Sequence, residues 1–216
     1  METPHTRDRL TLAALYLALT IPFIYYGVQV ACAAFEPNYS FVGQAASELG
    51  SDRAARPRWF NAGIMVQGVV TLIAAAGFLR AMLRLRVRAV LACLAAAALA
   101  VNGVQTLWAG YFPMPDPRHG GHPAFIAAMI ALPVLLTASL WRGSGTALKA
   151  YFVATLVLLL AMIPVMSGMA GIDTTNVRGL VQRVYTLTVF PPIAVAAYVL
   201  ALRLRADAQP RRGERM

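Results

Sequence analysis

Side chains able to carry out acid–base or metal chemistry are confined to three short polar segments between long apolar runs. The first segment contains Ser47, Glu48 and Asp52, the second contains Asp116, His119 and His122, and the third contains Asp173, Asn176, Arg178, Gln182 and Arg183. The remaining polar segments hold little besides arginine, glycine and serine. Helix packing alone does not require carboxylates and imidazoles, so we expect a functional site where these three segments meet.

The second segment, Asp116-Pro117-Arg118-His119-Gly120-Gly121-His122, places two imidazoles and a carboxylate within seven residues. Imidazole and carboxylate both suit zinc, and a metal-bound water is a hydrolytic nucleophile near neutral pH. His119, His122 and Asp116 are therefore candidate ligands of a divalent metal cofactor. Two other interpretations stay open. The histidines would transfer protons or orient a substrate, or they would belong to a polar turn at the level of the lipid headgroups.

Glu48 and Arg183 are two charged residues expected at the border of the hydrocarbon, because Glu48 lies in a stretch, 41–49, predicted to form a short interfacial helix. A carboxylate at the edge of the hydrocarbon suits a general acid or base, so Glu48 joins Asp116, His119 and His122 as a candidate catalytic residue. Arg183 lies about one turn inside the last predicted span, where a cation normally pairs with an acid or an anionic ligand. Arg183, together with Asn61 and Ser47, is expected to bind the substrate. The alternative for Arg183 is an internal ion pair, with Glu48, Asp116 and Asp173 as the candidate partners.

Composition places this chemistry in a membrane protein. Of the 216 residues, 59% are hydrophobic and 13% are charged, whereas a soluble domain usually carries about 25% charged residues. Because roughly 20 apolar residues of helix cross a bilayer core, the apolar runs predict an all-α, polytopic bundle of six transmembrane helices. The expected spans are residues 10–34, 59–79, 89–108, 124–141, 148–166 and 179–202. They form one transmembrane domain, 10–202, between an N-terminal segment, 1–9, and a basic tail, 203–216.

The positive charges predict the orientation of this bundle. Of the 19 lysine and arginine residues, 13 lie in the N-terminal segment, in the connections after the second and fourth spans, and in the tail. Cytoplasmic segments of membrane proteins are enriched in lysine and arginine. Both termini are therefore predicted to be cytoplasmic, with the three polar segments on the opposite side.

The net charge of +10 does not predict a nucleic-acid partner, although basic chains often bind phosphate backbones. The arginines lie at the ends of apolar runs, which is typical of membrane orientation and contact with anionic lipid. Membrane lipid is thus the expected partner, and the oligomeric state is left undetermined. The sequence contains no Gly-x-Ser-x-Gly motif, phosphate-binding loop or dinucleotide fingerprint.

Four short motifs in a fixed order resemble a known family. They are Ser47-Glu48-Leu49-Gly50, then Asn61 with Gly68, then Phe112-Pro113 with Asp116 and a following histidine, and then Gly179-Leu180-x-x-Arg183. This order is similar to that of the six-helix bacterial and archaeal membrane family catalogued as domain of unknown function 998. The resemblance implies six helices and a shared outward site. The expected location of this multi-pass chain is the bacterial plasma (inner) membrane. In that family the last motif often reads Gly-Leu-x-Glu-Arg, so Gln182 replaces an acid here.

Three functions are compatible with these residues. The first is an enzyme that acts on a lipid or isoprenoid-like amphipathic substrate from the outward side, and it requires the candidate residues to converge in one cavity. The second is a non-catalytic sensor or partner protein that binds a ligand with the same polar cluster. The third is a small-molecule transporter, which needs polar residues through the whole membrane thickness; the inner halves of the spans are uniformly apolar apart from the arginines.

Overall fold

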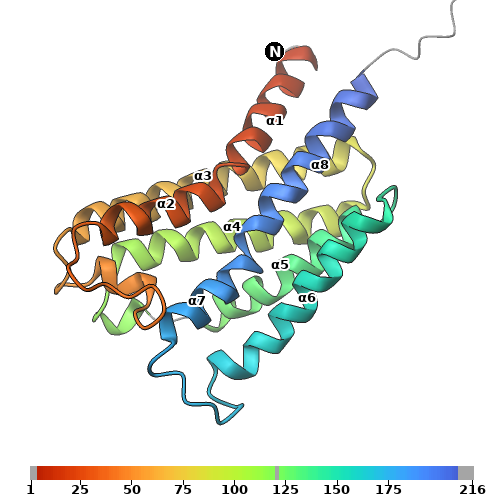
Figure 1. The fold of residues 1–216 in the computed structure, drawn as a ribbon. Coiled ribbons are helices and arrows are strands. Elements are labelled where there is room, and N and C mark those ends of the chain that lie inside the picture. Colours follow the sequence, from red (N-terminus) through yellow and green to blue (C-terminus); the bar gives the residue numbers. More distant parts are fainter. Residues whose placement is uncertain (1–3, 120–121, 209–216) are drawn as a thin grey trace, which may run out of the picture.

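The chain folds as a bundle of helices. The structure is a computed structural model that describes residues 4–119 and 122–208, and the secondary structure of this part of the chain is entirely helical (Figure 1). The elements are α1 (Pro4–Ala18), α2 (Ile21–Ala33), the 3-10 helix η1 (Ala46–Gly50), α3 (Pro57–Arg84), α4 (Ala89–Tyr111), the 3-10 helix η2 (Pro117–His119), α5 (Pro123–Leu140), α6 (Thr146–Met166), α7 (Arg178–Leu187) and α8 (Phe190–Ala208).

The predicted six-span architecture is confirmed within the described residues. Six helical segments are long and apolar enough to cross a membrane: Asp8–Ala33, Pro57–Arg84, Ala89–Tyr111, Pro117–Leu140, Thr146–Met166 and Arg178–Asp207. Helical structure extends further than expected at both ends of the chain, since α1 begins at Pro4 and α8 continues to Ala208. Residues 1–3 and 209–216 of the predicted terminal segments lie outside the described residues.

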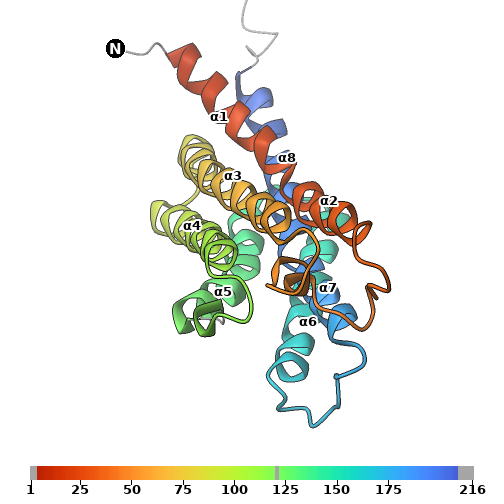
Figure 2. The same cartoon turned by 90° about the vertical axis from the view of Figure 1, so that its left-hand side faces the viewer.

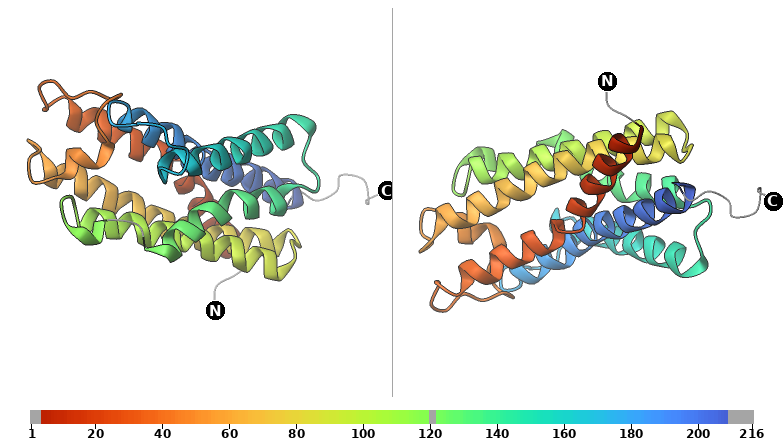
Figure 3. Two further views of the ribbon diagram at one scale, coloured as in Figure 1. Left: turned by 90° about the horizontal axis from the view of Figure 1, so that it is seen from below. Right: turned by 90° about the horizontal axis from the view of Figure 1, so that it is seen from above.

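The connections between spans divide between the two ends of the bundle. Residues 34–56, 112–119 and 167–177 lie at one end, which we call the loop end (Figures 1 and 3). The α3–α4 and α5–α6 connections and the end of α8 lie at the other, which we call the arginine-rich end. There, Arg84 Nη1 lies 3.2 Å from Asp207 Oδ2, and Arg203 Nη2 donates to the carbonyl of Leu140 and the hydroxyl of Ser144. The three polar segments therefore share one end of the molecule.

The first and last spans are each broken into two helices, whereas the apolar runs predict one continuous helix for each. Prolines near the start of α2 (Pro22) and of α8 (Pro191, Pro192) cause the breaks, because proline has no N–H and clashes with the carbonyl four residues earlier. Threonine hydroxyls donate hydrogen bonds to backbone carbonyls at both breaks. Thr20 Oγ1 donates to the carbonyl of Leu17 at 2.7 Å, and Thr188 Oγ1 donates to the carbonyl of Tyr185 at 2.6 Å. Backbone carbonyls freed near each break are thus hydrogen bonded inside the apolar layer, where an unpaired carbonyl is costly.

The two broken spans lie side by side. The rings of Tyr25 in α2 and Phe190 in α8 are 4.4 Å apart between centroids, and the hydroxyls of Tyr26 and Thr186 are 3.1 Å apart. Figure 2 shows α3 and α4 packed along each other, with α1 and α2 laid against α3. The α7–α8 span is therefore held against α2, which fixes where α7 emerges at the loop end.

Several amides in the core of the bundle have side-chain atoms without hydrogen-bond partners. Gln67 in α3 is 0% exposed, and in the described part of the chain neither its side-chain oxygen nor its side-chain nitrogen has a hydrogen-bond partner. The side-chain oxygens of Asn102 and Gln105 in α4 are likewise buried without a hydrogen-bond partner among these residues. An unpaired buried polar group costs about 1–3 kcal/mol, so these amides lower the stability of the bundle.

Replacing Gln67 with methionine is expected to stabilise the protein, because methionine has a similar volume and leaves no unpaired amide. We expect a gain of about 1 kcal/mol or more, which corresponds to a thermal midpoint about 2–4 °C higher. Unfolding of the purified protein in detergent, followed by circular dichroism, measures this change. Gln182→Met is the contrasting variant: Gln182 accepts a hydrogen bond from Ala46, so its loss lowers the midpoint. A lower midpoint for Gln67→Met would mean that Gln67 has a partner inside the bundle.

Candidate functional site

Arg183 holds the segment between α2 and η1 against the last span. Its Nη1 donates to the carbonyls of Phe41 at 2.6 Å and Gln44 at 3.0 Å, and its Nη2 donates to the hydroxyl of Tyr39 at 2.8 Å. Burial raises the pKa of Tyr39, so the phenol keeps its proton near neutral pH and donates to the carbonyl of Ala45 at 3.0 Å. Arg183 forms no ion pair, among the described residues, with the acids considered from sequence: Glu48, Asp116 and Asp173. Its partners are loop carbonyls and a phenol.

The residues around Arg183 complete this contact. The backbone N–H of Leu180, in the first turn of α7, donates to the carbonyl of Val42 at 2.9 Å. Gln182 Oε1 accepts the backbone N–H of Ala46 at 2.7 Å. Gly179 allows the close approach, since a Cβ at this position would lie 2.1 Å from the carbonyl oxygen of Gln44. The Gly-Leu-x-Gln-Arg sequence therefore forms the binding surface for residues 41–46. The side-chain oxygen of Gln182 accepts a backbone hydrogen bond there.

Asn61 and Ser47 fix η1 from its other sides. Asn61 Nδ2 donates to the carbonyl of Gly50 at 2.9 Å, and a Cβ on Gly50 would lie 2.2 Å from Asn61 Oδ1. Ser47 Oγ donates to Met114 Sδ at 3.3 Å, which joins the first polar segment to the turn after α4. Both residues, predicted from sequence to bind substrate, thus make contacts that hold η1 in place.

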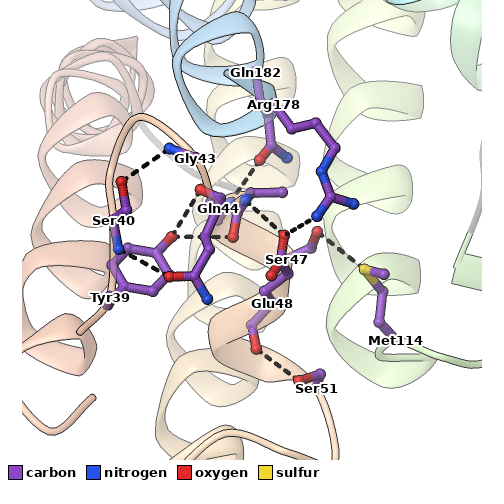
Figure 4. Close-up of polar contacts among 12 residues, drawn as sticks. Tyr39, Ser40, Gly43, Gln44, Ser47, Glu48, Ser51, Met114, Arg178 and Gln182 are labelled. Atoms are coloured by element: carbon purple, nitrogen blue, oxygen red, sulfur yellow. Dashed lines mark hydrogen bonds and ion pairs between the residues drawn. The ribbon is translucent and has the colours of Figure 1, made fainter. Parts of the chain in front are cut away.

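Glu48 lies at the centre of the loop end (Figure 4). Its Oε1 accepts the backbone N–H of Ala45 at 2.9 Å, a carboxylate contact at the start of a helix. The same oxygen lies 3.7 Å from Nη2 of Arg178, in the third polar segment, and the Glu48 side chain is 25% exposed. Glu48 Oε2 has no hydrogen-bond partner among the residues that the structure describes, so one carboxylate oxygen is free for a ligand.

A cavity of about 490 Å³ opens beside Glu48, between the α2–α3 connection, the turn after α4 and the start of α7. The α2–α3 segment forms most of the wall, the turn after α4 contributes a small apolar patch, and the first residue of α7 closes the remaining side. The lining residues are Glu36, Pro37, Tyr39, Gln44, Glu48, Leu49, Ser51, Asp52, Arg53, Ala54, Met114, Pro115 and Arg178. We call this cavity the loop-end pocket. It contains three carboxylates and two guanidinium groups.

Asp116 and its neighbours are engaged within their own turn. Arg118 Nε and Nη2 donate to the two carboxylate oxygens of Asp116 at 2.9 and 2.7 Å. These side-chain bonds, with a further bond from the Arg118 backbone N–H, lower the pKa of Asp116 to about 2. The guanidinium also lies over the ring of Phe112 at 3.9 Å from the centroid. Asp116 therefore holds no proton to donate near neutral pH, and neither residue lines the loop-end pocket.

The two histidines also make local contacts. His119 Nδ1 lies 2.8 Å from the carbonyl of Phe112, and His122 Nδ1 accepts the backbone N–H of Ala124 at 3.2 Å as the cap of α5. Within residues 4–119 and 122–208, no group of three or more histidine, cysteine, aspartate or glutamate side chains is arranged to hold a metal ion. The metal site formed by His119, His122 and Asp116 stays a prediction without geometric support.

Sequence reasoning selected Glu48 but missed most of the residues around it. Glu36, Asp52, Arg53 and Arg178 line the pocket, and their position in two of the three polar segments was the available signal. No sequence pattern marks Tyr39 or Gln44 as pocket residues. They reach it because Arg183 folds their segment over the end of the bundle.

A comparison with protein-family models identifies the wider group. The chain belongs to the family described as "Protein of unknown function (DUF998)", whose model matches residues 19–209. No curated protein and no solved structure matches the chain. The motifs on which the resemblance rests include Ser47 to Gly50, Asn61 and Gly179 to Arg183, and these are the residues that fix η1 and the segment before it.

Gly179→Ala is expected to release the segment over residues 39–46, because the added methyl group would overlap the carbonyl oxygens of Gln44 and Phe41. Limited trypsin digestion of the detergent-solubilised protein measures this change through the rate of cleavage after Arg53. We expect at least about tenfold faster cleavage, equivalent to about 1.4 kcal/mol of lost protection. Gly27→Ala is the matched control, since nothing lies within 4 Å of a Cβ there. Equal cleavage rates in the two variants would contradict the conclusion that α7 holds residues 41–46 in place.

Proposed function

We propose that this member of the DUF998 family is a membrane protein that binds the polar head of an amphipathic, lipid-like molecule in the loop-end pocket. One observation carries the proposal: Glu48 and Arg178 lie 3.7 Å apart in a cavity of about 490 Å³ at the ends of the membrane spans. Cavities of roughly 300–1,000 Å³ are the usual size for small-molecule sites. A ligand at this depth would keep its head in the pocket and its chain in lipid.

The charges of the lining favour a head that carries both signs. Glu48 Oε2 and the carboxylate of Asp52 have no ion-pair or hydrogen-bond partner in the described part of the chain, so both are available to an ammonium group. Arg178 has Glu48 as its ion-pair partner, and Arg53 lines the same cavity. Guanidinium groups bind phosphate and carboxylate by paired hydrogen bonds. A zwitterionic head, with an ammonium group and a phosphate or carboxylate, matches this lining.

Binding without catalysis is the better-supported function, because the acid–base residues do not converge. Asp116, His119 and His122 bond within their own turn, and none of the three lines the loop-end pocket. An enzyme is the second candidate, and the observation that favours it is that Glu48 lines the cavity with one carboxylate oxygen unpartnered among the described residues. In that case Glu48 would act as the general base on the bound amphiphile.

The orientation proposed is that of a multi-pass protein of the bacterial plasma (inner) membrane, with both termini cytoplasmic and the loop-end pocket outside. The distribution of lysine and arginine supports it. Single cysteines test this orientation. Asp52→Cys and Arg142→Cys are introduced one at a time at these two exposed positions, in a chain whose Cys32 and Cys93 are replaced by alanine. On intact cells, a membrane-impermeant maleimide should label Asp52→Cys and leave Arg142→Cys unlabelled until the cells are opened. The reverse pattern would invert the proposed orientation.

Glu48→Gln and Arg178→Gln are each expected to weaken binding of a zwitterionic head. Phosphoethanolamine is the soluble probe, and dioleoylphosphatidylethanolamine in nanodiscs is the membrane probe. Loss of one charged contact in the pocket should raise the Kd about tenfold, which corresponds to about 1.4 kcal/mol. Isothermal titration and native mass spectrometry measure the two probes.

Matched variants outside the pocket control for charge. Asp173→Asn and Arg58→Gln remove the same charges at the same end of the molecule, but neither residue lines the cavity, so the Kd should stay unchanged. Unchanged binding in Glu48→Gln and Arg178→Gln would exclude the loop-end pocket as the site. Conversion of the lipid by the natural protein but not by Glu48→Gln would favour the enzyme.

A further inference from the structure

A second cavity lies at the arginine-rich end, at the opposite end of the bundle from the loop-end pocket. Its volume is about 790 Å³, and it lies between the α3–α4 turn, the end of α5 and the last turns of α8. Its polar lining residues are Arg86, Arg88, Ser139, Arg142, Arg203 and Asp207. We call it the arginine pocket.

The arginine pocket has an uncompensated positive charge. The one carboxylate in its described lining, Asp207, already pairs with Arg84 at 3.2 Å, and Arg84 lies outside the lining. Among the described residues, no ion pair joins a carboxylate to any of the four arginines in the lining. Four cations around one cavity repel each other unless an anion lies between them, so the lining calls for a negatively charged occupant.

Two lining residues, Arg203 and Ser139, have polar atoms held at fixed positions in the wall of the pocket. Arg203 is half-buried, and its Nη2 is fixed by bonds to the carbonyl of Leu140 at 3.3 Å and the hydroxyl of Ser144 at 2.8 Å. Its Nη1 and Nε have no partner among the described residues. Ser139 is only 6% exposed and lines the pocket, and its hydroxyl has no hydrogen-bond partner within residues 4–119 and 122–208. A buried hydroxyl without a partner is costly, and an anionic oxygen beside it would accept its hydrogen bond.

The rest of the lining matches the border between headgroups and hydrocarbon. Leu85, Leu91 and Leu200 supply an apolar wall, and Trp141 lines the rim with the Lys149 ammonium 5.1 Å from its ring centroid. Tryptophan is enriched at membrane interfaces. Basic pockets between membrane helices commonly hold phosphate-bearing lipid heads.

We propose that the arginine pocket binds a phosphate group of an anionic amphiphile, with Arg88, Arg142 and Arg203 neutralising the phosphate and Ser139 donating to it. The site is distinct from the proposed function at the loop end, where the lining carries both signs of charge. The phosphate is supplied by an anionic lipid head or by a soluble phosphate compound, and both sources share this chemistry. Binding weakens as ionic strength rises, because the contacts are largely electrostatic and partly exposed.

The test is a titration of the full-length protein in detergent micelles with dioleoylphosphatidylglycerol, dioleoylphosphatidylcholine or inorganic phosphate. Native mass spectrometry counts bound lipid, and the thermal midpoint reports on inorganic phosphate. We expect phosphatidylglycerol to bind at least about tenfold more tightly than phosphatidylcholine, and the double variant Arg88→Gln/Arg142→Gln to lose at least about tenfold of that affinity. Both arginines are exposed, and Ser139→Ala is the second variant, with a smaller expected loss of affinity.

Controls separate this site from general charge effects and from the loop-end pocket. Arg80→Gln removes an exposed arginine at the same end that does not line the cavity, and Glu48→Gln alters only the other site, so both should keep full affinity. A response to inorganic phosphate without preference for phosphatidylglycerol would support the same pocket with a soluble ligand. No response to either probe would overturn the proposal, as would equal losses in Arg80→Gln and in Arg88→Gln/Arg142→Gln.

Discussion

The capture of loop carbonyls by Arg183 is the contact on which the loop end depends. One guanidinium binds two carbonyls and a phenol hydroxyl of the segment before η1. This segment forms no helix or strand, so without Arg183 its carbonyls would have to form hydrogen bonds with water. Once the segment is fixed, Tyr39 and Gln44 line the cavity and η1 is placed so that Glu48 faces Arg178. A cation at the end of a membrane span thus organises the structure by binding backbone, although a carboxylate partner is the usual expectation.

The position of α7 depends in turn on the break before α8. Pro191 and Pro192 end the α7 helix, and Thr188 satisfies a carbonyl that the break frees. The short α7 reaches the loop end beside η1 (Figure 1), while α8 packs in the core with α1 and α2. The two proline breaks are adjacent through Tyr25 and Phe190, so the geometry of the first span and that of the last are coupled. The contact between the two breaks therefore places α7 where its first residue, Arg178, lines the loop-end pocket.

The two ends of the molecule differ in the sign of charge that they present. The loop-end pocket combines three carboxylates with two arginines, whereas the arginine pocket has four arginines and a carboxylate already paired. A head with both charges suits the first cavity, and a phosphate suits the second. The two cavities thus differ in charge and lie at opposite ends of the helical bundle.

The sequence by itself determined the six apolar spans, because the length and hydropathy of a membrane helix are local properties set by bilayer thickness. It also determined that the three polar segments share one end, since each crossing reverses the chain direction. Glu48 could be chosen because its segment is polar and short. The partners of Arg183 and the separation of Asp116, His119 and His122 from Glu48 could not, because a hydrogen bond depends on ångström-scale placement of side chains from distant segments. Only the tertiary structure decided that the motif residues hold the wall of a pocket, since backbone carbonyls, which every residue carries, leave no mark in a sequence.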